Sequence, residues 1–257
     1  MINILVILAG GESTRFRDVG FITPKFLLPV YNTHLLNRQI EQARYAGVKR
    51  IIVSTHPDFF SKIAILSSKI VDVVSNQHHD KGAFAALANI ISGKKLKESI
   101  FCSLADIYFI DNPFVKLGHI TETTLFFAKP LYEQELAAGG IGFIDDGIVK
   151  KIVKPPIPNN SHGLRWNGLN VINRKSQNIL IGYIDKIHEE FPPEDFFSYL
   201  LSSGEMIKCQ NSVDFVNNNT VNDLFLSGLY NFADSLISFE KNRVISIAEI
   251  FRKKLLI

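Results

Sequence analysis

The chain has 257 residues, of which 46% are hydrophobic and 21% charged, a net charge of +3 and a pI near 8.7, and this length suits one large α/β domain. Its basic residues are scattered apart from two short runs at 94–97 and 252–254, so a nucleic-acid-binding stripe is not expected. No signal peptide or membrane span is predicted, and two cysteines, Cys102 and Cys209, are too few for a disulfide framework, which fits a cytoplasmic protein.

The first predicted element is a buried strand over residues 4–8, which ends in a loop of small residues. Residues 9–11 are Ala-Gly-Gly, and they allow the atoms of another molecule to approach the main chain. The loop that follows carries the cations Arg15 and Lys25 and only two acids, Glu12 and Asp18. Loop amides flanked by cations form a cradle for phosphates, so this stretch is predicted to bind an anion.

Apolar runs and helical periodicities then alternate along the first half of the chain. Strands are predicted over 51–53, 70–74 and 100–104, and helices over about 33–46, 57–68 and 82–91, the first of them capped by Asn32 or Thr33. This order predicts a Rossmann-like α/β domain with a mostly parallel sheet that is covered on both faces. Ligands of such sheets lie beyond the carboxyl ends of the strands.

The second half is predicted to continue the same domain. Strands are expected at 124–128, 166–172 and 206–210, a hairpin with a type I′ turn at Asp145-Asp146-Gly147, and a helix from Pro192. Amphipathic helices over 222–238 and 244–255 either finish the domain or form a subunit contact, which leaves a homo-oligomer open. One domain, 1–257, is therefore expected, with a nucleotide-binding half (1–112), an acceptor-binding half (113–230) and a C-terminal helical segment (231–257).

The first loop resembles the signature of the sugar-1-phosphate nucleotidylyltransferases. Its pattern is small-Ala-Gly-Gly-x-x-Thr-Arg and then Pro-Lys-x-Leu-Leu-Pro-Val, with ten residues from the Arg to the Lys. The resemblance implies the nucleotide-diphospho-sugar transferase fold with a mixed sheet. It also implies that Arg15 and Lys25 stabilise charge on the phosphates during transfer. Ser13 stands where the family usually has Gly. The implied triphosphate loop consists of Leu8, Ala9, Gly10, Gly11, Ser13, Thr14 and Arg15.

The same resemblance implies contacts to the nucleobase from a second loop. Gln77, followed five residues later by Gly82, matches the family's base-reading Gln and Gly, and Ala83 replaces the usual Thr. A side-chain amide both donates and accepts hydrogen bonds, which suits a pyrimidine edge and other bases as well. The identity of the nucleotide stays open.

A magnesium site is implied by two further positions. Asp106, at the end of the strand 100–104, matches the family's metal-binding Asp, although it is also suited to cap a helix. Asn217 stands where the family has its second ligand, and Asn222 is held in reserve for that role. An amide oxygen remains a competent ligand for Mg²⁺. Alternatively, this segment is a polar turn before a helix that Thr220 or Asn222 caps.

The acceptor side of the resemblance is looser. Gly140 lies in the family's sugar-facing strand, and Lys154 belongs to Val153-Lys154-Pro155, where the family has Glu-Lys-Pro. The missing Glu usually holds sugar hydroxyls. Asn167 and Gly168 match the strand that lines the acceptor pocket, and Asn167 is equally suited to cap a strand end.

The resemblance implies transfer of a nucleotidyl group from a nucleoside triphosphate to a sugar 1-phosphate, with release of pyrophosphate, in nucleotide-sugar and polysaccharide biosynthesis. The attacking phosphate is already ionised, so no dedicated base is required, and catalysis rests on positioning and charge. Two rivals remain. One is a non-sugar acceptor, such as a phosphorylated amino alcohol or a phosphonate. The other is a binding homologue that has lost turnover.

Overall fold

The computed structural model describes residues 3–11, 23–77, 81–115, 120–130, 139–154, 163–187, 189–236 and 238–255. The larger elements of the first half are β1 (Ile4–Ala9), α2 (Leu35–Tyr45), β4 (Arg50–Thr55), α3 (Pro57–Ala64), β5 (Val71–Ser75), α4 (Ala83–Gly93) and β6 (Ile100–Leu104). Between β1 and α2 lie the short elements η1 (Lys25–Leu27), β2 (Pro29–Val30) and β3 (Thr33–His34).

The second half is richer in strands. Its strands are β7 (Ile107–Phe109), β8 (Thr124–Ala128), β9 (Ile141–Asp145), β10 (Ile148–Val153), β11 (Leu164–Ile172), β12 (Lys208–Asn211) and β13 (Phe215–Asn217). Its helices are α5 (Arg174–Ile184), α6 (Pro193–Ser202), α7 (Val221–Asp234) and α8 (Ser238–Leu255).

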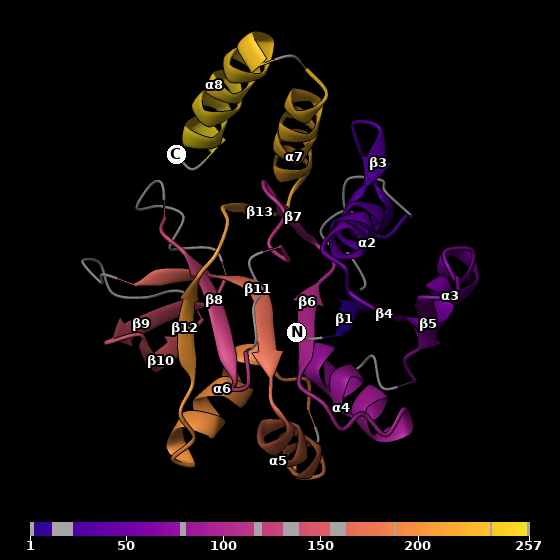
Figure 1. Ribbon diagram of the computed structural model, residues 1–257, viewed down its shortest axis with the longest axis vertical. Coiled ribbons are helices and arrows are strands. Elements are labelled where there is room, and N and C mark those ends of the chain that lie inside the picture. Colours follow the sequence, from indigo (N-terminus) through magenta and orange to yellow (C-terminus); the bar gives the residue numbers. More distant parts are fainter. Residues whose placement is uncertain are drawn as a thin grey trace.

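One nine-stranded sheet runs through both halves, in the order β5-β4-β1-β6-β11-β8-β12-β10-β9 (Figure 1). Its four strands from the first half, β5, β4, β1 and β6, are parallel to one another. The direction changes at β11, which is antiparallel to both β6 and β8. The sheet is therefore mixed, as expected, with its parallel part made by the first half of the chain.

Two hydrophobic cores lie on opposite faces of this sheet. Alternate residues of β1 point to each face, so Val6 belongs to the core beneath α4, α5 and α6, and Ile7 belongs to the core beneath α2 and α3. Both side chains are fully buried. Burial on both faces explains why β1 reads as a continuous apolar run rather than an alternating one.

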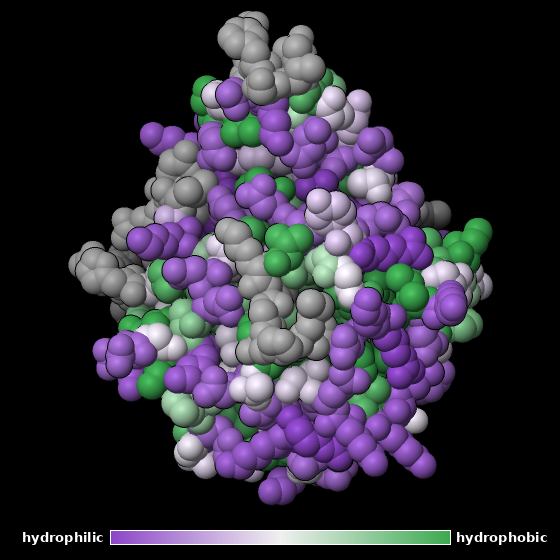
Figure 2. Space-filling view, in the orientation of Figure 1, coloured by the Kyte–Doolittle hydropathy of each residue, from purple (hydrophilic) through white to green (hydrophobic). Residues whose placement is uncertain are grey.

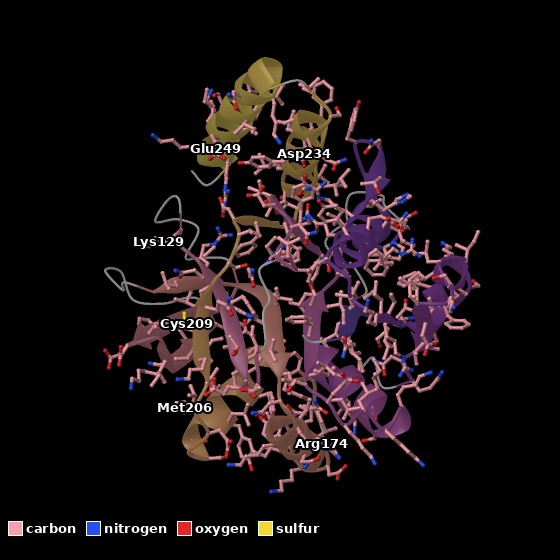
Figure 3. The ribbon with its side chains drawn as sticks, viewed as in Figure 1. Lys129, Arg174, Met206, Cys209, Asp234 and Glu249 are labelled. Atoms are coloured by element: carbon pink, nitrogen blue, oxygen red, sulfur yellow. The ribbon has the colours of Figure 1, made fainter. Side chains whose placement is uncertain are left out.

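The last two helices cover a third, smaller cluster. Leu224 and Tyr230 of α7 and Ala248 of α8 pack with residues of β7 and β13. Figure 1 shows the two helices side by side, outside the layers formed by the nine-stranded sheet and its covering helices. Polar contacts add to this packing. Arg38 of α2 donates to Asp234 Oδ2 at 2.9 Å, and Tyr230 donates to Glu249 across the helix pair; both carboxylates are labelled in Figure 3.

Most predicted elements are present, with differences that have local causes. The hairpin turn is confirmed, because Asp146 and Gly147 both have positive φ, 47° and 69°, as a type I′ turn requires. Helix α2 begins after His34 rather than after Asn32 or Thr33, because the residues before it pair in β2 and β3. The sequence analysis missed α5 and the short strands β7 and β13. The alternative in which Thr220 caps α7 is also present, as a capping box with Asp223.

On the face shown in Figure 2, hydrophilic residues predominate and apolar residues form small groups between them. Within the described ranges, none of the helices is both long enough and apolar enough to cross a membrane.

An ion pair between Arg252 and Asp214 joins α8 to the segment before β13, and its loss is expected to lower the stability of the protein. Arg252, 3% exposed, donates to both oxygens of Asp214, at 2.8 and 3.3 Å, and to the carbonyl of Phe215 at 3.2 Å. We expect Arg252→Ala to lower the free energy of unfolding by about 2 kcal/mol, which corresponds to a melting temperature lower by about 4–8 °C. Exposed Lys254→Ala is the control, and an equal loss in both variants would contradict the assignment.

Candidate active site

A cavity of about 870 Å³ opens at the carboxyl ends of β1 and β6. Its floor on one side is formed by Leu8, Gly10 and Gly11, and on the other side by Asp106 and the residues next to it. Main-chain hydrogen bonds join the two sides, since Ala105 N donates to Leu8 O at 3.1 Å. The cavity therefore lies where parallel α/β sheets place their ligands.

The glycines of the first loop leave space that none of the described residues fills. A Cβ atom added at Gly10 or Gly11 would meet nothing within 4 Å. The absence of side chains here is therefore not required by packing among the described residues, and it leaves the main chain open to a bound molecule. Ser13, Thr14 and Arg15 lie outside the described residues.

Lys25 and Asp106 meet across the cavity and form an ion pair. Lys25 opens η1 directly after Pro24, and Asp106 follows β6, so the two charges come from loops 81 residues apart. Their side chains are 16% and 21% exposed. Each charge thus has a partner while staying accessible to a ligand.

Asn217 is brought to the same place by a strand pairing. β13 pairs antiparallel with β7, which puts Asn217 opposite Ile107, the residue after Asp106. Asn217 lines the cavity, and its Oδ1 is buried without a hydrogen-bond donor among the described residues. Asn222 lies exposed in the first turn of α7 and does not line the cavity. Of the two predicted asparagines, the geometry therefore brings only Asn217 to Asp106.

Asn218 holds this arrangement together and was not singled out from the sequence. Its main-chain N and its Nδ2 both donate to the carbonyl of Asp106, each at 3.0 Å. Its Oδ1 accepts from Ser227 Oγ of α7 at 2.8 Å. The side chain is completely buried, so these bonds fix Asp106 from behind rather than contacting a ligand.

The predicted base-reading loop is placed differently from the expectation. Gly82 and Ala83 line the cavity, but Gln77 does not; its side chain is exposed and donates to Ser75 Oγ at 3.2 Å. The amide that lines the cavity is the neighbouring Asn76, which is 6% exposed. Consecutive residues of extended chain point to opposite sides, so a one-residue difference decides which amide faces the cavity.

Gly82 is required by its surroundings. It has φ of +90°, and a Cβ there would lie 2.8 Å from the carbonyl oxygen of Phe191. This glycine allows the segment before α6 to close the cavity over the start of α4.

Of the four residues predicted to bind the acceptor, Gly140, Lys154 and Gly168 line the cavity, whereas Asn167 does not. Asn167 is fully buried, donates to Ser212 Oγ at 2.5 Å and accepts from Leu169 N at 3.0 Å. The alternative that Asn167 supports the strand is therefore the one that the geometry favours, because both ends of its amide are occupied.

A carboxylate that the sequence analysis treated only as a helix-start signal also faces the cavity. Glu194, in the first turn of α6, is 7% exposed, and burial raises the pKa of its carboxyl, while its own main-chain N–H and Lys154 lower it in part. Two acids after Pro192-Pro193 indicated a helix start, and nothing in the pattern indicated that the first of them points inward.

Comparison with known proteins agrees with this architecture. Residues 5–117 match the model of the MobA-like NTP transferase domain. A curated relative, the bifunctional IPC transferase and DIPP synthase of Aquifex aeolicus, is 33% identical over 84 residues. This match covers 32% of the chain and 20% of the relative, so the chain aligns with about a fifth of that protein's length.

Solved structures are similar over nearly the whole chain. The inositol-1-phosphate CTP transferase from T. maritima has a TM-score of 0.73 at 14% identity, with 96% of each chain covered. An apo UDP-glucose pyrophosphorylase gives 0.73 at 16% identity, covering 92% of this chain and 100% of its own. CTP:phosphocholine cytidylyltransferase from Streptococcus pneumoniae gives 0.69 at 20% identity, covering 86% and 96%.

The fold is that of the nucleotide-diphospho-sugar transferases. Residues 5–117, the part of the chain that resembles the MobA-like NTP transferase domain, include Gly10, Lys25 and Asp106 of the cavity.

The raised pKa of Glu194 predicts a pH-dependent stability difference. The folded state holds this proton to higher pH than the unfolded state does. The carboxyl therefore contributes most to the free energy of unfolding below its ordinary pKa. This contribution is lost as the pH rises through the pKa of the folded state. Glu194→Gln carries no such charge. We expect its melting temperature to exceed that of the wild type by about 2 °C or more at pH 7 and to match it near pH 4, at about the ordinary pKa of Glu.

Thermal unfolding at a series of pH values measures this difference. Glu189→Gln, which removes an exposed carboxylate shortly before α6, is the control and should follow the wild-type curve. A Glu194→Gln variant that is less stable than the wild type at pH 7 would show that the ionised carboxylate is stabilised by its surroundings instead.

Proposed function

We propose that this protein transfers a nucleotidyl group from a nucleoside triphosphate to a small phosphorylated acceptor, a sugar 1-phosphate or a related polyol phosphate, and releases pyrophosphate. The observation that carries the proposal is the convergence of Lys25, Asp106 and Asn217 beside an open glycine loop in one cavity. A cation and hard oxygen ligands next to a stretch of main chain without side chains suit a reaction between two polyanions.

In this proposal, each residue has a role that follows from its charge. Lys25 places a positive charge where the phosphates meet, and the main chain at Gly10 and Gly11 provides a close approach for the triphosphate. The attacking oxygen belongs to a phosphate that is already ionised, so its nucleophilicity needs no proton transfer to the protein. Positioning and charge compensation then account for the rate.

Asp106 and Asn217 fit a divalent cation such as Mg²⁺. The unpartnered, buried Oδ1 of Asn217 and the carboxylate of Asp106 are the hard oxygen donors that such an ion prefers. In the described part of the chain, no group of three or more His, Cys, Asp or Glu side chains is placed to hold a metal, so phosphate oxygens would complete the coordination. When bound, the ion would supply charge neutralisation at the phosphates.

Cytidylyl transfer to inositol phosphate is a second candidate within the same chemistry. It is favoured by two comparisons, the curated IPC transferase relative and the inositol-1-phosphate CTP transferase structure that covers 96% of both chains. Val153, which stands where the resemblance expects a sugar-binding Glu, agrees with an acceptor other than the usual sugar 1-phosphates.

The test is pyrophosphate release with Mg²⁺, crossing CTP, UTP, dTTP, GTP and ATP with glucose 1-phosphate, N-acetylglucosamine 1-phosphate, inositol 1-phosphate and phosphocholine. A productive pair establishes the reaction and identifies both substrates. Nucleotide binding without turnover of any pair would instead support the binding homologue.

Loss of either member of the ion pair is expected to abolish most turnover. Lys25→Ala and Asp106→Ala should each lower kcat by about a hundredfold or more, because a preorganised charge at the phosphates is removed. Lys129→Ala is the control for loss of a positive charge, since Lys129 is exposed away from the cavity (Figure 3). Asp185→Ala, at an exposed helix end, is the control for the carboxylate. Wild-type turnover in either cavity variant would contradict the proposal.

Asn217 is expected to set the metal requirement. Asn217→Ala should raise the Mg²⁺ concentration for half-maximal activity by about tenfold, on the scale of losing an interaction that supports a metal site, and Asn217→Asp should lower it because a charged ligand is added. A magnesium titration at saturating substrates measures both. Asn222→Ala should leave the titration unchanged, and a shift in that variant alone would return the role to Asn222.

A further inference from the structure

Of the described carboxylates that line the cavity, Glu194 is the most deeply buried. It is 7% exposed, against 21% for the side chain of Asp106, while Glu190 at the rim is exposed. The segment Phe191–Pro193 leads directly into α6 and directs this side chain inward. A buried carboxylate costs free energy unless donors satisfy it, so its retention in a cavity calls for a partner.

The position of the carboxylate is defined by Gly140 and Trp166. A Cβ atom built at Gly140 would lie 2.8 Å from Glu194 Oε1 and 3.2 Å from Trp166 Cε3. The carboxylate and the indole edge therefore stand side by side against a stretch of main chain without a side chain. Trp166 is itself fixed, since its Nε1 donates to Leu169 O at 3.0 Å and its ring meets that of Phe197 edge-on.

Within the described ranges, most of the hydrogen-bonding capacity of Glu194 is unused. An ionised carboxylate accepts about four hydrogen bonds. Among the described residues, the donor to this one is its own main-chain N–H. The remaining acceptor positions face a cavity that Gly140 keeps open. A ligand with adjacent hydroxyl groups would supply the missing donors.

The charge around Glu194 distinguishes between acceptor types. Lys154 lines the same part of the cavity and acts electrostatically on the Glu194 carboxyl. A quaternary ammonium group placed against Glu194 would also be repelled by Lys154. A hydroxyl suits both neighbours, because it donates to the carboxylate and accepts from the ammonium group.

We propose that Glu194 is the specificity-determining residue for the acceptor, and that it selects a phosphorylated polyol ring by accepting hydrogen bonds from neighbouring hydroxyl groups. This inference rests on the proposed function and deepens it. Glu194 thereby takes the role that Val153 leaves vacant, from a different element, and acceptors with a cationic end are disfavoured.

The experiment measures acceptor binding by calorimetry, separately from turnover. The 257-residue protein is titrated with glucose 1-phosphate, inositol 1-phosphate and phosphocholine. Each titration contains Mg²⁺ and the non-hydrolysable α,β-methylene analogue of one nucleoside triphosphate, and all five analogues are used in turn. We expect the wild type to bind a polyol phosphate more tightly than phosphocholine. Glu194→Ala should weaken polyol binding by about tenfold or more, the scale of hydrogen bonds to a charged group, and should leave the affinity for the nucleotide analogue unchanged.

Two further variants make the result decisive. Glu194→Gln keeps the side-chain shape and is expected to fold, and it should lose most of the polyol affinity because one acceptor oxygen is replaced by a donor. Asp195→Asn removes an exposed charge one residue along α6 and should bind like the wild type. A deoxy analogue of the preferred polyol phosphate should bind the wild type more weakly than the parent compound does. Glu194→Ala should bind the analogue and the parent compound with similar affinity.

Each alternative result overturns the inference. Tighter binding of phosphocholine than of either polyol phosphate would make Glu194 a cation site, and unchanged polyol binding in both Glu194 variants would make the residue structural. Absence of measurable polyol binding to the wild type would also overturn it. Polyol binding that depends on Glu194, without pyrophosphate release from any pair, would uphold the inference on acceptor recognition and reject the proposed catalysis.

Discussion

The pairing of two short strands outside the main sheet is the constraint on which the site depends. β7 and β13 bring together the loop after β6 and the segment before α7, and Asn218 closes the junction with two hydrogen bonds to Asp106, a residue 112 positions earlier. Main-chain pairing sets the relative position of Asp106 and Asn217 before any ligand enters. Such preorganisation is what makes charged groups effective in a site, because little rearrangement is required on binding. The helices α7 and α8, which pack over this pair, therefore support the site although they lie away from the cavity.

Much of the fold could be predicted because its signals are local. Continuous apolar runs marked the buried parallel strands β1, β4 and β6, and Asp146-Gly147 marked the turn between β9 and β10. Helix α5 was missed because it begins with polar and basic residues after Asn173 and lacks a clear apolar stripe in its first turn. β7 and β13 are three residues each, and only their long-range pairing makes them strands, which no local pattern reveals.

Prediction of which residues lie at the cavity worked where their position follows from the ends of predicted strands, while the roles of these residues stay predictions. The ends of β1 and β6 placed Gly10 and Asp106 at one cavity, whereas Asn217 was named from the resemblance and lies there through β13, a strand that was not predicted. It failed where a single residue decides the direction of a side chain, as between Asn76 and Gln77, and where tertiary packing turns a side chain inward, as for Glu194. Asn167 differs from Glu194, because it matches a binding motif but its amide is fully occupied by hydrogen bonds to Ser212 and Leu169.

The two walls of the cavity come from separate stretches of the chain, and the direction of the sheet changes between them at β11. The first wall belongs to the parallel strands within residues 5–117, the part that matches the MobA-like model. The second is built from β9 to β11 and the segment entering α6. Side chains such as Glu194 and Lys154 can therefore be exchanged in evolution without disturbing the hydrogen bonds of the opposite wall. A chain built in this way allows one wall of its cavity to change while the hydrogen bonds of the other wall stay the same.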